Sequence, residues 1–411
     1  MLSVHTSPLA ALGGKETGGM NVYVRELSRQ LCKRGWQVDC FTRLQDPSQP
    51  RIELRIPGCR VIHIPAGPAE HIDRRKLFPF LPEFVQGVRD FAASEGVSYD
   101  LLHSHYWLSG WVARELQREW QVPVVHMFHT LGRMKDLVAD KPSDREASNR
   151  AEVEQEIMDF ADRIVAATPL DRQQMLDLYQ VDEAKIVVIP CGVDLELFRP
   201  IDPQVARREL GLPDGQRLLL FVGRLDPVKG LNVLLEAMCE LTRRMKPCRA
   251  QDLCLAVIGG DKESHLEALM NDLECLQDIR HRLGLEDLVV FVGSRSQEVL
   301  PYYYSAAEIC VMPSLYESFG MVALEAMACG TPVIASRVGG LTFTVRDGET
   351  GFLVPEKDPK ALAEKLYLVL TNDCLRRRLG HRAVEVARGY DWSIVADDIE
   401  ALYAELGVYR T

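Results

Sequence analysis

Several features that define other protein classes are scarce or absent in this sequence. Its 411 residues contain no apolar run near the ~18 residues that a membrane-spanning helix needs. The first residues lack the basic segment and apolar stretch of a signal peptide. The 11 cysteines form no C-x-x-C pair, which disfavours a structural zinc site and indicates a reducing compartment. These absences predict a cytoplasmic protein with no transmembrane segment.

Positive charge is in the minority. The chain has 48 Lys and Arg residues against 59 Asp and Glu, a net charge of −11. Such a chain is a poor generic binder of nucleic acid, although it can still hold local basic pockets. Hydrophobic residues make up 47% and charged residues 26%, which excludes disordered, collagen-like and small disulfide-stapled proteins. The length predicts two or three domains.

Short, nearly continuous apolar runs alternate with amphipathic stretches along the whole chain. Such runs suit parallel strands that helices cover on both faces, so we predict an α/β protein. The expected strands are Leu2–Thr6, Val38–Thr42, Val61–Pro65, Leu101–His105, Val122–Met127, Arg163–Ala167, Ile186–Pro190, Leu218–Gly223, Leu253–Gly259, Leu288–Gly293, Ile309–Pro313, Val333–Ala335 and Gly351–Val354. A β/α barrel is the main rival, but it requires eight regular units and the spacing here is uneven.

Two sets of about six strands predict two doubly wound, Rossmann-like domains. The stretch Cys191–Pro213 carries three prolines and few apolar residues, which is typical of a boundary. We therefore expect an N-terminal domain over 1–197 and a C-terminal domain over 198–391. The last segment, Trp392–Leu406, has the pattern of an amphipathic helix.

A glycine-rich turn, GGKETGG from Gly13 to Gly19, precedes the helix predicted over Met20–Arg34. Glycines let the backbone approach a ligand closely, and a helix N-terminus attracts anions. The turn has the form of a phosphate or sugar cradle. It matches neither G-x-G-x-x-G nor the Walker pattern, so a plain tight turn is the alternative. A second turn of this kind is Gly339-Gly340.

Two cations lie at the end of a predicted strand, in the run LFVGRLDPVKG. Arg224 follows the strand, and Lys229 stands five residues later. Such a pair suits a diphosphate, with arginine as a bidentate fork and lysine as a point charge. It can stabilise a leaving diphosphate without a metal. The alternative is surface ion pairing, for example with Asp226.

Two glutamates follow the strand Ile309–Pro313. Glu317 lies in the predicted loop and Glu325 in the next helix, eight residues later among apolar neighbours. At ~1.5 Å per helical residue, the two carboxylates can lie ~10 Å apart along one ligand. A carboxylate in apolar surroundings needs donors, which vicinal sugar hydroxyls supply. Capping and ion pairing are the alternative roles.

These residues together resemble the retaining glycosyltransferases of family 4, which have the GT-B fold. The E-x7-E motif from Glu317 to Glu325, the pair of Arg224 and Lys229 and the terminal helix carry the resemblance, which spans nearly the whole chain. The resemblance implies two Rossmann-like domains facing each other across a cleft. It also implies that the helix within 392–411 crosses back onto the first domain.

Two subgroups of that family are closest. The runs His5–Ala10, Gly18–Val24 and His103–Gly110 resemble the inositol-phosphate N-acetylglucosaminyltransferases of mycothiol synthesis. The runs Leu77–Val85 and His129–Lys135 are closer to bacterial sucrose-phosphate synthases. Both subgroups use a UDP-activated sugar and a phosphorylated acceptor.

The resemblance implies a donor site in the second half of the chain. Glu325 would hold the donor ribose and Glu317 the donor hexose, while Arg224 and Lys229 would hold the diphosphate. The other implied donor contacts are Gly18 and Gly19 at sugar and phosphate, the backbone near Arg295 at the uracil, and Gly320, Met321 and Val322 between the two glutamates.

The resemblance also implies an acceptor site in the first half. In the inositol-phosphate enzymes a Lys, a Tyr, a Thr and an Arg grip the acceptor phosphate. The matching positions are Arg74, Tyr106, Thr130 and Arg150, with Lys76 and Lys135 as further cations and His5 and Asn21 at the acceptor ring. The chain departs from the pattern at Arg74, at Ala11 in place of a donor-contacting Gln, and at Ser305 in place of an Arg. These departures concern the acceptor more than the donor.

The acceptor region also has a reading independent of the family. Arg74, Lys135 and Arg150 are three cations that can converge on one anion in an otherwise acidic protein. The alternative is a solvated helix face. On that face Arg145 and Arg150 would pair with Glu146, Glu152 and Glu156.

Four histidines, His103, His105, His126 and His129, raise the question of a metal site. Their spacing is that of alternating strand positions, and no thiolate or carboxylate completes a ligand set. We therefore predict no metal site. His129, at a strand end, is assigned to a contact with the sugar and grouped with Arg224, Lys229 and Glu317 as catalytic.

The predicted activity is transfer of a hexosyl unit, glucose or N-acetylglucosamine, from a UDP-sugar to a hydroxyl of a small phosphorylated acceptor. Fructose 6-phosphate and inositol phosphate are the two expected acceptors. The UDP-sugar is a substrate, and no cofactor is required; Mg²⁺ is compatible with the chemistry but not needed. No nucleophile stands near the inferred donor site, so front-face attack with retention is expected.

Three alternatives stay open. The first is a transferase for a lipid-linked or protein acceptor, which would want an exposed basic and apolar face. The second is a nucleotide-sugar epimerase on the same fold, which would want a general acid and base. The third is a non-catalytic nucleotide-sugar binder. The sequence leaves the sugar, the acceptor and the oligomeric state, including a homodimer, undetermined.

Overall fold

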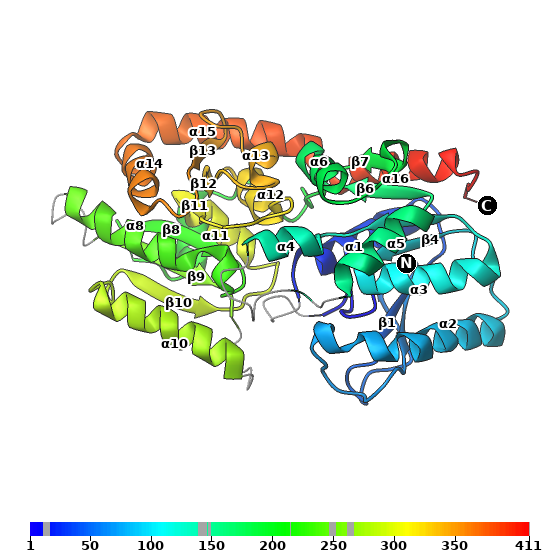
Figure 1. Ribbon diagram of the computed structural model, residues 1–411. Helices are drawn as coiled ribbons and strands as arrows, with labels where there is room; N and C mark the ends of the chain where they lie inside the picture. Colours follow the sequence, from blue (N-terminus) through cyan, green and yellow to red (C-terminus); the bar gives the residue numbers. More distant parts are fainter. Residues whose placement is uncertain are drawn as a thin grey trace. The chain divides into compact units, whose positions relative to one another are not determined.

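The computed structural model describes residues 1–10, 17–138, 146, 149–213, 215–245, 252–260 and 267–410 (Figure 1). The chain forms two compact units. The first, here called the N-unit, comprises Met1–Ala10, Gly19–Cys191 and Trp392–Thr411. The second, the C-unit, comprises Gly192–Asp391 and a short segment that ends at Gly18. The chain passes from one unit to the other within the proline-rich stretch predicted as a boundary.

The C-unit is built on one parallel sheet (Figure 1). Its strands are β8 (Arg217–Val222), β9 (Leu253–Ile258), β10 (Val289–Gly293), β11 (Ile309–Met312), β12 (Val333–Ser336) and β13 (Gly351–Val354). They pair in the order β10-β9-β8-β11-β12-β13, so the strand order reverses between β8 and β11. In open α/β sheets, ligands bind outside the carboxyl ends of the strands at this reversal.

Helices cover the strands of the C-unit. They are α7 (Pro203–Glu209), α8 (Leu231–Arg244), α10 (Glu267–Arg282), α11 (Leu300–Ala306), α12 (Met321–Ala328), α13 (Leu341–Thr344), α14 (Pro359–Thr371) and α15 (Asp373–Ala387), with short 3-10 turns η5 (Pro227–Lys229) and η6 (Arg388–Tyr390). α8 packs against α10 and α14, while α12 packs against α11 and α15. Strands β9, β11 and β12 are therefore buried throughout, which explains their continuous apolar sequences.

The N-unit contains two groups of strands. One group is β1 (Val38–Arg43), β3 (Cys59–Ile64) and β2 (Ile52–Ile56), and the other is β4 (Leu102–His105), β5 (Val124–Met127), β6 (Arg163–Ala166) and β7 (Ile186–Val188). Leu2 joins the groups through parallel bridges to Phe41 and Ser104. The strand order therefore reverses at Leu2, between β1 and β4.

The predicted strand Leu2–Thr6 is wrong: the structure has only the isolated bridge at Leu2. The Val4 carbonyl still accepts from the Arg43 N–H of β1 over 3.1 Å, and the chain bends at His5 and Thr6, where the Ser3 hydroxyl donates to the Thr6 carbonyl over 2.6 Å. Strand β2 was not predicted at all. It pairs antiparallel to β3, and Leu54 and Arg55 within it are exposed, so it lacks the apolar run of a buried strand.

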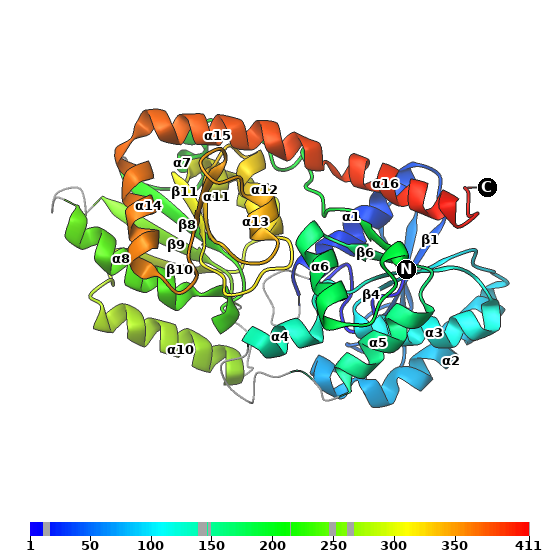
Figure 2. The ribbon, with the colours of Figure 1, turned by 45° about the horizontal axis from the view of Figure 1, so that its top comes forward.

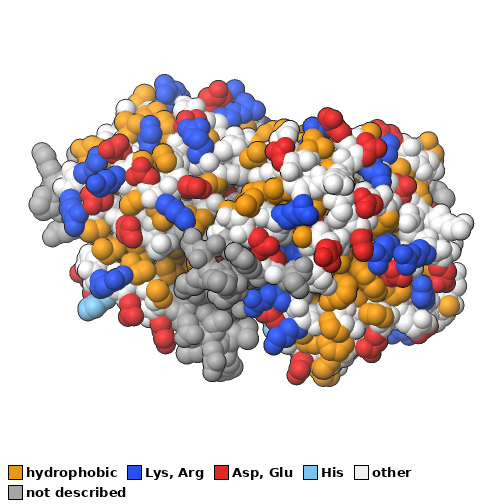
Figure 3. All heavy atoms as spheres, viewed as in Figure 1, with side chains coloured by type: hydrophobic (Ala, Val, Ile, Leu, Met, Phe, Trp, Pro, Cys, Tyr) orange, Lys and Arg blue, Asp and Glu red, His pale blue; other side chains and the backbone are white. Residues whose placement is uncertain are grey.

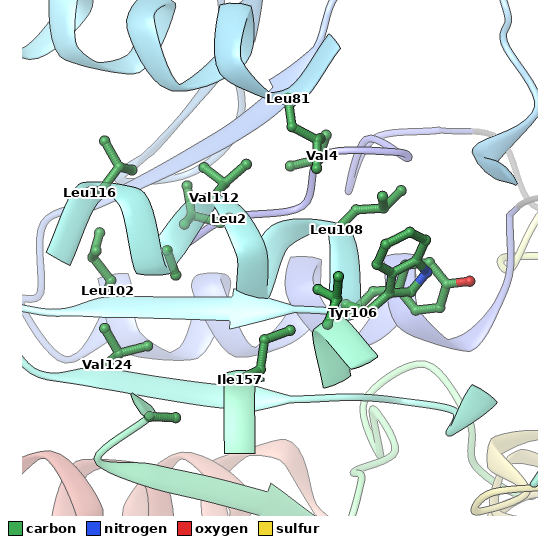
Figure 4. Packing of buried hydrophobic residues seen from close by; sticks show 14 of the residues in the cluster. Leu2, Val4, Leu81, Leu102, Tyr106, Leu108, Val112, Leu116, Val124 and Ile157 are labelled. Carbon is green, nitrogen blue, oxygen red and sulfur yellow. The ribbon is translucent and has the colours of Figure 1, made fainter. Parts of the chain in front are cut away.

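The helices of the N-unit surround a core of aliphatic side chains. They are α1 (Gly19–Lys33), α2 (Leu81–Glu95), α3 (Trp107–Trp120), α4 (Gly132–Val138), α5 (Arg150–Phe160), α6 (Pro169–Leu178) and α16 (Trp392–Glu405), with the short turns η1 (Arg74–Lys76), η2 (Phe78–Phe80) and η4 (Glu183–Lys185). Figure 4 shows Leu2, Leu102, Val112 and Val124 packed between α3 and the strands. This core fixes the carboxyl ends of the first strands.

The last helix, α16, belongs to the N-unit although it follows the whole C-unit in sequence. It packs along α1 (Figure 2). Arg34 pairs with Asp397 over 2.7 Å, and the Tyr403 hydroxyl is 2.7 Å from Nδ1 of His103. No helix in the described part of the chain has the length and apolar character to cross a membrane.

Surface charge is mixed. On the face that Figure 3 shows, Lys and Arg side chains of the described residues are interspersed with Asp and Glu side chains. This pattern fits the excess of acidic residues in the composition. We therefore expect positive charge concentrated enough to bind a phosphate in buried clusters and not on that face.

Candidate functional site

The predicted donor residues gather at the strand-order reversal of the C-unit. Arg224 follows the end of β8 and Glu317 follows the end of β11. Lys229 closes the 3-10 turn η5, and its Nζ lies 2.5 Å from Oε2 of Glu317. Because β8 and β11 are neighbours in the sheet, the cation of one loop meets the carboxylate of the next. Arg224 also lies 3.8 Å from Asp226, the partner that the sequence suggested.

The two loops that carry this pair are locked together by their backbones. The Leu315 N–H donates to the Val228 carbonyl over 2.8 Å. Gly230 lies so close to Pro313 that a Cβ on it would stand 2.0 Å from the Pro313 carbonyl oxygen. The position of Lys229 beside Glu317 is therefore fixed by the fold as well as by charge.

Helix α12 begins directly after this loop. Gly320 caps it with φ at 95°, and Met321 and Val322 form its first turn. The Gly340 N–H donates to the Glu317 carbonyl over 2.8 Å, which ties the loop after β12 to the same place. Free N–H groups and the positive end of the helix dipole make this an anion-binding position.

Glu325 is nearly buried on α12, with 7% of the residue exposed. The Tyr304 hydroxyl, from α11, donates to its Oε2 over 2.8 Å. Burial and the charge of Glu325 raise the pKa of Tyr304 well above its usual value, so the hydroxyl stays protonated. This contact was not predicted from the sequence. The signal was available, because a buried carboxylate requires a donor.

Two further predicted donor contacts, Arg295 and Gly18, lie on other segments of the chain. Arg295 follows β10, is exposed, and donates to the Ser294 carbonyl over 2.8 Å. Gly18 precedes α1, which begins at Gly19, and a Cβ on Gly18 would meet no described atom within 4 Å. Packing therefore does not require glycine at Gly18. The remaining residues of the predicted turn, 13–16, lie outside the described residues, as do Ala11 and Arg145.

The predicted acceptor residues centre on Arg150, whose side chain is fully buried in the N-unit. Its guanidinium donates to the Tyr106 hydroxyl over 3.0 Å and to the Thr130 hydroxyl over 3.2 Å, and it stacks over the Tyr106 ring at 4.8 Å. Arg150 also pairs with Glu154 over 2.7 Å and with Glu146 over 2.9 Å. The structure thus brings Tyr106, Thr130 and Arg150 together.

Two further cations join this group through Glu146. Lys135 lies 2.7 Å from the Glu146 carboxylate, and Arg74 lies 3.8 Å from it. Arg75 pairs with Asp73 instead. Lys76, also predicted, is exposed on η1 and lies outside this set of contacts. Of the three basic residues in that run, Arg74 is the one beside the acceptor cluster.

The charged groups of the cluster shift one another's pKa values. Burial and the neighbouring Arg74 lower the pKa of Lys135 to about 8, although Glu146 opposes this shift. Burial works against ionisation of Glu146, but Arg150, Lys135 and Arg74 hold its pKa at about 2. Burial also opposes the charge of Arg150, yet Tyr106, Glu154 and Glu146 raise its pKa above the usual value. Glu146 and Arg150 are therefore charged at neutral pH.

A solvated helix face, the alternative from sequence, does not describe Arg150. Its partners Glu146 and Glu154 stand four residues before and four after it and are buried with it. Glu156 pairs with Arg114 instead, and Glu152 is exposed. Glu154 was not among the residues singled out from the sequence. Its i,i+4 spacing from Arg150 was the available signal.

His5, Asn21 and His129 lie at the carboxyl edge of the same sheet. His5 packs on the Tyr106 ring at 4.5 Å, and burial followed by the nearby Arg74 lowers its pKa well below the usual range. The Asn21 amide donates to Thr6 Oγ1 and to the Ser7 carbonyl, both over 2.6 Å, so it holds the first loop. A contact of Asn21 with an acceptor ring stays a prediction.

His129 follows β5 with φ at 60°, in the left-handed region. Its Nε2 lies 3.1 Å from Nδ1 of His105. Burial lowers the pKa of His129 to about 3, so the ring is neutral at pH 7. It can make a hydrogen bond to a sugar, but it does not supply positive charge. No group of His, Cys, Asp and Glu in the described part of the chain is arranged to hold a metal ion.

Comparison with known proteins gives the same division of the chain. A family model described as "Glycosyl transferase 4-like domain" matches residues 18–192, and one described as "Glycosyl transferases group 1" matches residues 202–386. The fold and these matches define the class: the chain belongs to the family 4 glycosyltransferases, and it has the GT-B fold.

Its similarity to particular members extends over nearly the whole length. A D-inositol 3-phosphate glycosyltransferase of Frankia alni is 43% identical over 404 residues, which is 97% of each chain. A protein of the same name from Catenulispora acidiphila is 42% identical over 98% of this chain and 94% of its own. The sucrose-phosphate synthase of Thermosynechococcus elongatus, a solved structure, is 38% identical with a TM-score of 0.90, over 99% of this chain and 98% of its own.

Proposed function

We propose that this glycosyltransferase transfers a hexosyl unit from a UDP-sugar to a hydroxyl group of a small phosphorylated acceptor, with retention at the anomeric carbon. The observation that carries this substrate class is the cluster of Arg74, Lys135 and Arg150 in the N-unit, in which Arg150 is buried and Arg74 and Lys135 are partly exposed. Cations this close together need anions beside them, and Glu146 and Glu154 supply two negative charges against three positive ones. A phosphate monoester supplies about −1.5 to −2 charges at pH 7 and three strong acceptor oxygens, which suits a site with several cations.

The donor belongs in the C-unit in this proposal. Arg224 and Lys229 bind the diphosphate together with the first N–H groups of α12. Glu325, oriented by Tyr304, accepts hydrogen bonds from the ribose hydroxyls, and Glu317 accepts them from the hexose. Two relatives have a phosphorylated compound in their names, the D-inositol 3-phosphate glycosyltransferase and the sucrose-phosphate synthase, which supports inositol phosphate and fructose 6-phosphate as acceptors to test.

The chemistry follows from these positions. As the bond between the anomeric carbon and the diphosphate oxygen breaks, negative charge develops on that oxygen. Arg224 and Lys229 stabilise this charge, so no metal ion is required for the step. The departing oxygen takes the proton of the acceptor hydroxyl, which attacks the same face of the sugar.

Equal turnover with a chelator and with added Mg²⁺ is the expected result, and loss of activity in the chelator would refute metal independence.

The test compares phosphorylated and unphosphorylated acceptors. UDP-glucose and UDP-N-acetylglucosamine are each assayed with inositol phosphate against inositol, and with fructose 6-phosphate against fructose. We expect one phosphorylated acceptor to react with kcat/KM at least ~100-fold above its unphosphorylated form, because charged hydrogen bonds contribute about 1.5–3 kcal/mol each. Equal rates for the two forms would reject the acceptor assignment.

A further inference from the structure

The acceptor cluster already contains an anion, and it belongs to the chain itself. Lys135 Nζ lies 2.7 Å from Oε1 of Glu146, Arg150 NH1 lies 2.9 Å from Oε2, and Arg74 NH2 lies 3.8 Å from Oε1. The Glu146 side chain is only 6% exposed. Its two oxygens therefore stand among three cations, as two oxygens of a phosphate would.

We propose that the Glu146 carboxylate stands in the position of the acceptor phosphate and competes with it for Arg74, Lys135 and Arg150. Binding of the acceptor then exchanges one anion for another. This inference rests on the proposed function, and it adds a residue that sets which acceptors can bind. Glu146 acts on specificity and takes no part in the bond-forming step.

The second glutamate beside Arg150 shows the contrast. Glu154 pairs with Arg150 over 2.7 Å, but it also accepts from the Gly132 N–H over 2.9 Å and from the Tyr179 hydroxyl. These donors belong to the fold and are independent of any acceptor. Glu154 is therefore the permanent counter-ion of Arg150. Among the described residues, the Glu146 side chain pairs with the three cations, so its contacts are those that a phosphate would take over.

Charge balance explains why a phosphate can displace this carboxylate. Three cations face two glutamates, which leaves one positive charge in the cluster. A phosphate monoester carries about −1.5 to −2 charges at pH 7, so its exchange for Glu146 neutralises the cluster more fully. Glu146 is ionised at neutral pH, as its pKa of about 2 indicates. An unphosphorylated sugar brings no charge to replace it and leaves the cations paired with Glu146.

The test uses Glu146→Gln, which keeps the shape of the side chain and removes its charge. Glu152→Gln is the matched control: it removes the same charge from the first turn of α5, where Glu152 is exposed. Calorimetric titration of the full chain with inorganic phosphate measures the effect. We expect Glu146→Gln to lower the Kd for phosphate at least tenfold and to lower the acceptor KM. Glu152→Gln should leave both within twofold.

A Kd for phosphate that is unchanged or higher in Glu146→Gln would overturn the proposal, because it would make Glu146 a support of the cluster rather than a competitor. Adding Arg74→Gln to Glu146→Gln should remove the gain, and a gain that persists would also overturn it. If Glu146→Gln does not fold, Glu146→Asp is the second variant, because it withdraws the carboxylate by one methylene. It should tighten phosphate binding by a smaller factor than Glu146→Gln. Unchanged phosphate binding in Glu146→Asp would count against the proposal.

The failure of this inference differs from the failure of the proposed function. If the wild-type chain prefers phosphorylated acceptors but Glu146→Gln binds phosphate no more tightly, the inference alone is rejected. If the wild-type chain shows no preference for phosphorylated acceptors while UDP still binds, the acceptor assignment itself is rejected, and the inference with it.

Discussion

At the scale of single residues, Arg150 differs from the cations around it. It is fully buried and held by Glu146, Glu154, Tyr106 and Thr130. Removing one member of a buried ion pair costs about 3–5 kcal/mol of stability, because the other charge stays buried without compensation. A substitution of Arg150 therefore changes both the stability of the protein and its acceptor binding, and the two effects cannot be separated. Arg74 and Lys135, which are partly exposed, are the better probes of the acceptor phosphate.

Tyr304 gives a prediction at the same scale. Its hydroxyl donates to the Glu325 carboxylate, and Tyr304→Phe removes that donor while leaving the ring. A hydrogen bond to a charged group contributes about 1.5–3 kcal/mol. Without the Tyr304 hydroxyl the Glu325 carboxylate is less well oriented, so part of this free energy should be lost from its binding to the ribose. We expect UDP affinity, measured by calorimetry, to fall about tenfold.

The neighbouring Tyr303 supplies the control for that experiment. It lies on the same helix, is partly exposed, and carries the same hydroxyl. Tyr303→Phe should leave UDP affinity within twofold of the wild-type value. If Tyr304→Phe also leaves UDP affinity unchanged, Glu325 does not bind the ribose in the way proposed.

At the scale of elements, the C-unit site depends on close contacts between loops. The loop after β12 approaches the loop after β11 so closely that a Cβ on Gly340 would lie 2.2 Å from the Ser318 carbonyl oxygen and 2.5 Å from Phe319 Cα. Gly340 has an ordinary helical φ of −65°, so its backbone tolerates other residues. The limit there is space, and backbone atoms cannot move aside as a flexible side chain can.

Gly340→Ala should therefore displace Glu317 and the start of α12. We expect a loss of about 1–3 kcal/mol in unfolding free energy, the usual cost of overpacking, together with weaker UDP binding. Chemical denaturation and calorimetry measure the two effects. Gly389→Ala makes the same change where a Cβ meets no described atom within 4 Å, and its effects should be small. Equal behaviour of the two variants would contradict the packing argument.

Most strands could be predicted from the sequence because both faces of the sheets are buried. β13 occupies the predicted range Gly351–Val354, and β9 and β11 end one residue before the predicted ends. The failures occur where that condition does not hold. β2 is an edge strand with exposed Leu54, and the segment from Leu2 forms one bridge and bends at His5 and Thr6. Neither feature leaves a local apolar signature.

At the scale of the whole molecule, the sequence indicated which candidate residues lie at the strand ends but not how they pair. Arg224, Lys229 and Glu317 were predicted from strand ends, and the structure adds the ion pair between Lys229 and Glu317, 88 residues apart. Contacts over such separations depend on strand order, which local patterns do not encode. For the same reason Glu146 entered the sequence argument only within the alternative of a solvated helix face, since its contacts with Arg74 and Lys135 require three separate segments to meet.

The two units hold separate anion sites in this account, the diphosphate in the C-unit and the acceptor phosphate in the N-unit. Each site has a partly exposed lysine, Lys229 and Lys135, whose replacement by methionine keeps most of the unbranched side chain and removes its charge. These two variants separate the sites within one molecule. Both lysines are ion-paired to a glutamate, so the two substitutions are also matched in the partner that they leave behind.

The most direct measurement is therefore a crossed titration of Lys229→Met and Lys135→Met with UDP and with inorganic phosphate. The account predicts that Lys229→Met weakens UDP binding at least tenfold and leaves phosphate binding in the N-unit within twofold, while Lys135→Met does the reverse. We expect a loss of at least tenfold because a hydrogen bond to a charged group contributes about 1.5–3 kcal/mol, and each variant removes such a bond. Loss of UDP binding in Lys135→Met, or normal UDP binding in Lys229→Met, would contradict the assignment of donor and acceptor to the two units.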